Sequence, residues 1–96
     1  MLFHLTWDAI DTSEESLKRR TELFTRWKPG PGTFQGFYGF ADGSGGVAIV
    51  EAASAADLAK TLAPWVPFLQ FEARVILPVE EAVKIGSEAA AWREGS

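Results

Sequence analysis

The side chains best suited to chemistry in this sequence are His4 and the alternating polar residues Gln70, Glu72 and Arg74. Histidine is the residue type that most readily exchanges a proton near neutral pH, and His4 is the only one present, so it is the candidate general base. Positions i, i+2 and i+4 of a β-strand point to one face, which brings the three polar residues together. A buried tyrosine hydroxyl seeks a hydrogen-bond partner, which adds Tyr38. We predict a site in which His4 is catalytic and Tyr38, Gln70, Glu72 and Arg74 bind the ligand.

In such a site Glu72 would set the tautomer of His4, and Arg74 would hold an anionic group of an acidic or phenolic ligand. Two plainer interpretations stay open. His4 can be a histidine that its neighbours across a sheet satisfy, without chemistry. Glu72 and Arg74 can be charged residues of an edge strand that oppose edge-to-edge aggregation.

Other catalytic and metal-binding patterns are not found. The chain has no cysteine, which excludes disulfides, thiolate nucleophiles and cysteine-based zinc sites. No Gly-x-Ser-x-Gly elbow supports a serine hydrolase, and residues 42–46 (DGSGG) read as a hairpin turn instead of a phosphate-binding loop. The carboxylates Asp42, Glu51 and Glu72 show no metal-ligand spacing, so we expect neither metal nor cofactor.

Composition indicates one small acidic domain over residues 1–96. The chain has 13 acidic and 9 basic residues, and 47% of its residues are hydrophobic, which is too apolar for a disordered chain. A domain of this size buries only about 60–65% of its unfolded surface, so we expect a homodimer. The net charge of −4, without an extended basic cluster, argues against nucleic acid as a partner.

The same chain shows no signal for a membrane or for export. No apolar run reaches the roughly 18 residues of a membrane span, and the first residues lack the basic start of a secretion signal. Together with the absence of cysteine, this predicts a cytoplasmic protein.

Hydrophobic patterning predicts the elements that must position the candidate residues. Strands are expected at residues 2–7, 34–41, 46–51 and 68–77. Helices are expected at residues 13–28, where Thr12 and Glu15 fit a capping box, from Ser54 to an end marked by Pro64 and Pro67, and from Pro78 through Trp92. We interpret Trp27 and Trp65, which lie on helical faces, as packing residues and not as a ligand cage.

This order predicts an α+β, ferredoxin-like split βαβ sandwich, βαββαβ plus a C-terminal helix, with antiparallel sheet order 4-1-3-2. The first two helices would cover one face of the sheet. The other face, expected to carry Phe68, Ile76 and aromatic residues of the second strand, would be closed by a partner sheet or helix in a homodimer with an internal cavity. His4 would then point into the cavity between the two sheets.

Five segments together resemble a small bacterial family, a domain of unknown function within the dimeric α+β barrel superfamily, which is antibiotic-biosynthesis-monooxygenase-like. The segments are residues 1–7 (MLFHLTW), 36–43 (GFYGFADG), 46–51 (GVAIVE), 63–65 (APW) and 76–78 (ILP). The superfamily includes cofactor-independent quinone-forming monooxygenases, haem-degrading monooxygenases, muconolactone isomerase-like enzymes and non-enzymatic ligand-binding or stress proteins. The resemblance implies the dimeric α+β barrel and supplies no catalytic motif that transfers residue by residue.

Two functions follow as expectations. The first is a homodimeric, cofactor-independent monooxygenase or isomerase that acts on a small hydrophobic or aromatic substrate. The alternative is a non-enzymatic ligand-binding or accessory protein whose working surface is the dimer interface. Haem binding through His4 follows from superfamily analogy alone.

Overall fold

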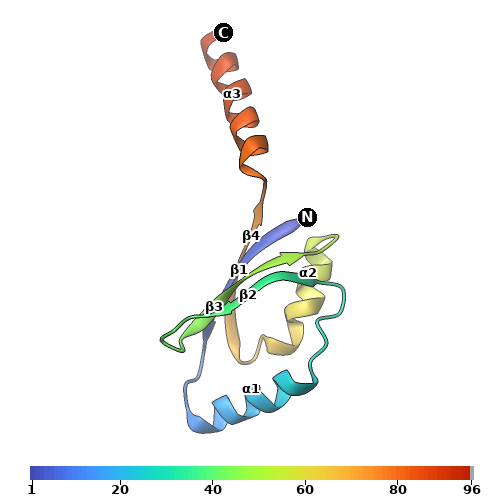
Figure 1. The fold of residues 1–96 in the computed structure, drawn as a ribbon, viewed down its shortest axis with the longest axis vertical. Coiled ribbons are helices and arrows are strands. Elements are labelled where there is room, and N and C mark those ends of the chain that lie inside the picture. Colours follow the sequence, from blue (N-terminus) through green and yellow to red (C-terminus); the bar gives the residue numbers. More distant parts are fainter. Residues whose placement is uncertain (96) are drawn as a thin grey trace.

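Four strands and three α-helices follow one another in the computed structural model, which describes residues 1–95 (Figure 1). In chain order they are β1 (Leu2–Ala9), α1 (Glu14–Arg26), β2 (Thr33–Gly39), β3 (Gly45–Glu51), α2 (Ala55–Leu62), the 3-10 turn η1 (Ala63–Trp65), β4 (Leu69–Ile76) and α3 (Val79–Gly95). The sheet order is β2-β3-β1-β4 with every pair antiparallel. The predicted ferredoxin-like α+β fold is therefore confirmed.

Both of the first two helices begin at a serine that caps the first turn. The Ser54 hydroxyl accepts a hydrogen bond from the Asp57 amide at 3.1 Å, at the cap position that the sequence predicts. In α1 the cap is Ser13 and not Thr12, and its hydroxyl accepts from the Ser16 amide at 3.2 Å. The reason is Asp11, whose carboxylate accepts hydrogen bonds from both the amide and the hydroxyl of Ser13 and so fixes that residue at the helix start.

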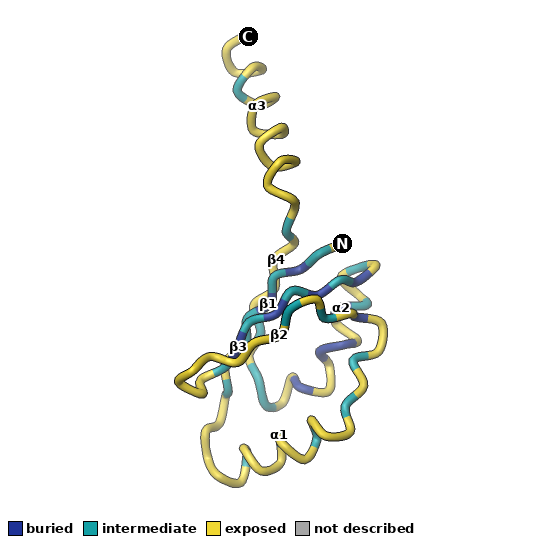
Figure 2. Tube along the Cα trace, in the orientation of Figure 1, coloured by how far each residue is buried: buried dark blue, intermediate teal, exposed yellow. Residues whose placement is uncertain are grey.

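The hydrophobic core lies between α2 and one face of the sheet (Figure 2). Alternate residues of the two central strands enter it, and α2 adds Leu58 and Leu62. The sheet residues of this core are Phe3, Leu5, Ala48 and Val50. By contrast, α1 contributes no buried residue, although it lies on the same side of the sheet.

A β-bulge in β2 decides where two aromatic rings point. Phe34 pairs with Val50 and Phe37 pairs with Ala48, so the residues between them are one more than a regular ladder allows. Without the bulge, side chains three positions apart would point to opposite faces. With it, Phe34 and Phe37 both lie on the helix-covered face and stack with ring centroids 4.7 Å apart. The expectation that the aromatic residues of this strand line the uncovered face is wrong for these two.

The opposite side of the sheet, here called the open face, has no helix over it within residues 1–95. It carries the even-numbered residues of β1 and β4 and the odd-numbered residues of β3. The last helix, α3, extends beyond the end of the sheet, so the molecule is elongated, with extents of 60 × 27 × 19 Å. None of the residues of α3 is buried. Within residues 1–95, no helix is long and apolar enough to cross a membrane.

Candidate functional site

All five predicted site residues lie on the open face, but only some of them are close to one another. His4 on β1 lies directly opposite Arg74 on β4, and Glu72 is opposite Thr6, one same-face position along the strand. Gln70 lies opposite Asp8, four residues along β1 from His4, which is about 13 Å at the usual rise of a strand. The structure thus brings His4, Arg74 and Glu72 together and leaves Gln70 at the far end.

Tyr38 lies on the same face, on the edge strand β2 at the opposite edge of the sheet from β4. It pairs with Val47 on β3, so β3 separates it from β1. Its ring leans over Gly36, since a Cβ at Gly36 would lie 3.2 Å from Tyr38 Cε2. Gly36 lies opposite Ile49, which in turn lies opposite His4. The tyrosine ring therefore points along β2 toward the row of the sheet that contains His4.

Within residues 1–95, the predicted site residues form no polar network with one another. In the part of the chain that the structure describes, no hydrogen bond or ion pair joins any two of the five predicted residues. Tyr38, Gln70, Glu72 and Arg74 are exposed and His4 is half-buried. Among residues 1–95, no three histidine or acidic side chains are placed to hold a metal ion. Chemistry on this face needs a second wall over it.

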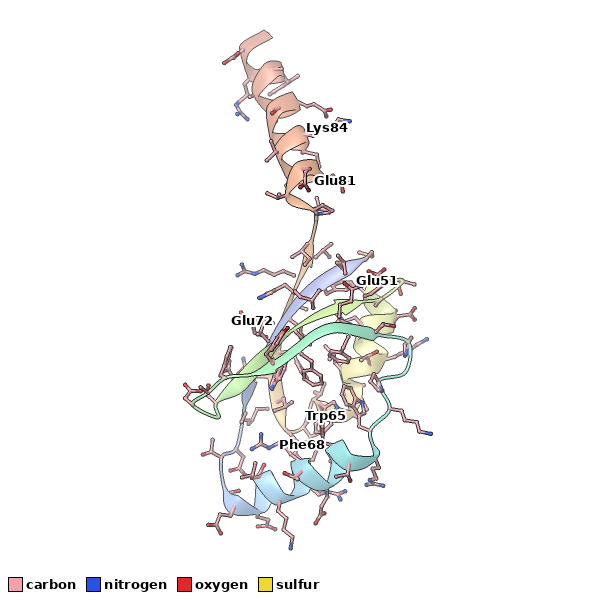
Figure 3. The ribbon with its side chains drawn as sticks, viewed as in Figure 1. Glu51, Trp65, Phe68, Glu72, Glu81 and Lys84 are labelled. Atoms are coloured by element: carbon pink, nitrogen blue, oxygen red, sulfur yellow. The ribbon has the colours of Figure 1, made fainter. Side chains whose placement is uncertain are left out.

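A cavity lies on the other face of the sheet, between α1 and the strands. It has a volume of about 520 Å³ and is open to solvent on one side. Figure 3 shows Trp65 in this space between the sheet and α1. Glu72, one of the predicted site residues, is on β4 and not in this space. We call this cavity the aromatic cleft, because seven aromatic residues line it. Phe71 is one of them, and the other six contact one another: Trp7, Phe24, Trp27, Phe34, Phe37 and Trp65.

The rings form a continuous wall from α1 to β2. Trp27 and Trp65 meet edge to face with centroids 5.4 Å apart at 89°, an arrangement that aromatic quadrupoles favour. Phe24 lies in the last turn of α1. Its ring centroid is 6.2 Å from those of both Trp65 and Phe37, so it connects the helix to the sheet. On β1, Trp7 can lie flat over its neighbouring strand because a Cβ at Gly46 would overlap the indole.

Few polar groups reach the aromatic cleft. The hydroxyls of Thr21 and Thr25 donate to carbonyls of their own helix, at 2.9 and 2.7 Å. Among the described residues that line the cleft, Arg20 is the only charged one. Arg20 Nε, Trp27 Nε1 and Trp65 Nε1 are buried without a hydrogen-bond acceptor within residues 1–95. Buried donors of this kind are uncommon in folded proteins and mark a place where an acceptor fits.

Sequence reasoning did not find this cleft. It assigned Trp27 and Trp65 to packing, whereas both also form its wall. It placed Phe68 on the open face beside Ile76. Ile76 is there, opposite Leu2, but Phe68 precedes β4 and lines a second, more polar pocket of about 530 Å³ beside the start of α1. One sequence signal was available for the cleft: Leu17, Arg20, Thr21 and Phe24 recur at i, i+3, i+4 and i+7, which places them on one side of a helix.

The comparison with family models covers nearly all of this architecture. The model of a domain of unknown function, DUF3303, matches residues 1–90. The chain belongs to the DUF3303 family. The match runs from β1 into α3, so the open face and the aromatic cleft both lie inside the DUF3303 domain. No curated protein matches the chain.

Proposed function

We propose that this DUF3303 protein binds a small molecule with a planar, apolar ring system in the aromatic cleft. The observation that carries the proposal is the cleft itself: its volume of about 520 Å³ is that of a small-molecule pocket, and aromatic rings dominate its lining. Leu17 and Phe24 point apolar surface into it and are each 55% exposed. A ligand that fills the cleft would remove this surface from water, which favours binding.

The helix that carries these two residues is suited to admitting a ligand. No residue of α1 is buried, so little packing energy opposes a small shift of this helix. The opposite wall is firmer, because it is built on Trp65 and on strands whose other residues form the core. We therefore expect the ligand to enter beside α1 and the helix to close over it.

The test uses N-phenyl-1-naphthylamine, an uncharged probe whose fluorescence rises in an apolar site. We expect saturable binding of one probe per chain. Phe24→Ala should weaken it about three- to tenfold, the usual value of one aromatic contact. Tyr38→Ala removes an exposed ring from the open face and serves as the matched control, with unchanged binding expected. Absence of saturable binding, or equal effects of the two variants, would contradict the proposal.

A second candidate function, an enzyme, is supported by the placement of His4, Tyr38, Glu72 and Arg74 on one face. In this proposal the open faces of two copies face each other, and the homodimer encloses a cavity. His4 is the general base, and Arg74 and the other polar side chains position a hydrophobic or aromatic substrate. The protein would be a cofactor-independent monooxygenase or isomerase. Because the sheet separates His4 from the aromatic cleft, the two proposals concern different sites.

Anthrone is a suitable probe for the monooxygenase form of this candidate, since its reaction with dioxygen gives anthraquinone and water and changes the absorbance. We expect the dimeric protein to accelerate the reaction. His4→Ala should slow it about 100-fold or more, the usual contribution of a general base, while the dimer stays intact. The same substitution should leave naphthylamine binding in the aromatic cleft unchanged. An equal rate with His4→Ala would remove this residue from the mechanism.

A further inference from the structure

The aromatic cleft contains a positive charge that no carboxylate neutralises. Arg20 lies on the side of α1 that faces the sheet, and no aspartate or glutamate is among the described residues that line the cleft. Neither of the ion pairs found within residues 1–95 includes Arg20. This is unusual in a chain with 13 acidic and 9 basic residues, where carboxylates are in excess. The chain therefore supplies acidic groups in plenty, yet none is placed against this guanidinium.

The contact between Arg20 and Asp11 is made through the backbone of Asp11 and not through its carboxylate. Arg20 Nη2 donates to the backbone carbonyl of Asp11 at 3.4 Å and not to its side chain. Both carboxylate oxygens of Asp11 are occupied by Ser13, at 2.9 and 3.1 Å, in the contact that starts α1. Asp11 thus holds the guanidinium through its backbone carbonyl, and its carboxylate makes no ion pair with Arg20.

The Nε–H of Arg20 is a free donor. Arg20 Nε is buried and has no acceptor in the described chain. A guanidinium binds a carboxylate or sulfonate through two parallel N–H groups, and one such pair is formed by Nε–H and the second N–H of Nη2, whose other N–H donates to the Asp11 carbonyl. Since α1 has no buried residue, the Arg20 side chain can turn toward an incoming anion without disturbing the core.

We propose that the ligand of the aromatic cleft is an aromatic anion whose ring packs among the aromatic side chains while Arg20 binds its negatively charged group. This inference rests on the proposed binding function and adds the chemical class of the ligand. Arg20 lies one helical turn before Phe24, so the anionic group and the ring would bind at neighbouring positions along α1. The indole N–H groups of Trp27 and Trp65, also without acceptors, favour a ligand that carries further acceptors.

Two pairs of matched probes test the charge separately from the ring. The first pair is N-phenyl-1-naphthylamine and 8-anilinonaphthalene-1-sulfonate, which share a ring system and differ by the sulfonate. We expect Arg20→Met to weaken binding of the sulfonate about tenfold or more, the usual effect of a charge-assisted hydrogen bond, and to change binding of the neutral probe less than about twofold. The matched control is Arg19→Met, which removes the same charge from an exposed position outside the cleft, and should leave both affinities nearly unchanged.

The second pair needs no variant and so does not depend on the folding of one. On the unmodified protein, 2-naphthoate should displace N-phenyl-1-naphthylamine at a concentration about tenfold lower than the neutral isostere 2-naphthamide does. Equal displacement by the two, or equal effects of Arg19→Met and Arg20→Met on the sulfonate, would overturn the inference while the binding proposal stands. If the neutral probe does not bind at all, the binding proposal itself fails.

Discussion

At the scale of single residues, the hydroxyl of Thr61 connects the loop after α1 to α2. Thr61 is 1% exposed; its Oγ1 accepts a hydrogen bond from the buried Gly32 amide at 2.9 Å and donates to the Asp57 carbonyl at 3.3 Å. The contact requires glycine, because a Cβ at Gly32 would lie 2.7 Å from that oxygen. We expect Thr61→Val, which keeps the shape, to lower the free energy of unfolding by about 1–3 kcal/mol, since the Gly32 amide loses its acceptor.

Urea unfolding measures this change, and Thr25→Val provides the control. The Thr25 hydroxyl is exposed and donates only to the Glu22 carbonyl of its own helix, so its loss should change the unfolding free energy by less than about 0.5 kcal/mol. Equal stabilities of the two variants would show that the Gly32 amide finds another acceptor.

Also at this scale, the β2–β3 hairpin contains a carboxylate with a pKa below its ordinary value of 3.8. The Ser44 hydroxyl and amide donate to Asp42 Oδ1 at 2.7 and 3.0 Å and favour the ionised form. Since the folded pKa lies below the unfolded one, the stabilisation is present above about pH 4 and is lost as the pH falls through the folded value. Ser44→Ala should raise the pKa of Asp42 toward 3.8, as NMR titration of its carboxyl carbon would show, whereas Ser87→Ala on α3 should not. An unshifted Asp42 in Ser44→Ala would mean that the amide alone holds the charge.

At the scale of elements, the order of strands and helices was predictable because each has its own local signal. The period of two in β4, the serine caps and the prolines after α2 and before α3 act within a few residues. The face on which Phe34 lies was not predictable, because it depends on one extra residue in the β2 ladder. The alternation of residues along one strand does not reveal such a bulge, which is defined by the pairing with β3. The cleft was missed for the same reason: it exists only where the bulge turns Phe34 and Phe37 toward α1.

The two capped helices should respond differently to loss of their caps. Ser13→Ala should lower the stability of α1 by about 0.5–2 kcal/mol, because the helix loses its N-cap hydrogen bond. Since no residue of α1 is buried, we expect faster amide exchange in α1 and little change in the free energy of global unfolding. Ser54→Ala removes the equivalent contact from α2, whose Leu58 and Leu62 are in the core, and should lower the urea midpoint. Hydrogen exchange and urea unfolding of both variants make the comparison. A shift of the urea midpoint in Ser13→Ala as large as in Ser54→Ala would show that α1 belongs to the cooperative core.

At the scale of the whole molecule, α3 leaves a large apolar surface uncovered. Most of its apolar residues lie in one half of the helix circumference, with Val79, Val83 and Ile85 exposed. Its glutamates and Lys84 occupy the other half, whereas Arg93 lies among the apolar residues. A helix of 17 residues is about 26 Å long, close to the length of an eight-residue strand, and can therefore cross the sheet of another copy. A small domain gains most from covering such surface in a homodimer. We expect two copies to associate, with the apolar half of each α3 packed on its partner.

Two lysine substitutions on neighbouring turns of α3 test this association. Val83→Lys places a charge in the apolar half, where a partner would bury it, and should shift the protein toward a monomer of 10.5 kDa. Ser87→Lys adds the same charge in the polar half, about 40° farther around the helix and one turn along it, and should leave the dimer intact. Sedimentation equilibrium over a range of concentrations measures both. A wild-type monomer, or a dimer equally tight in the two variants, would show that α3 is not the interface. No described residue that lines the aromatic cleft comes from α3, so we expect monomeric Val83→Lys to bind N-phenyl-1-naphthylamine as the wild type does. That result would show that the cleft is complete within one chain.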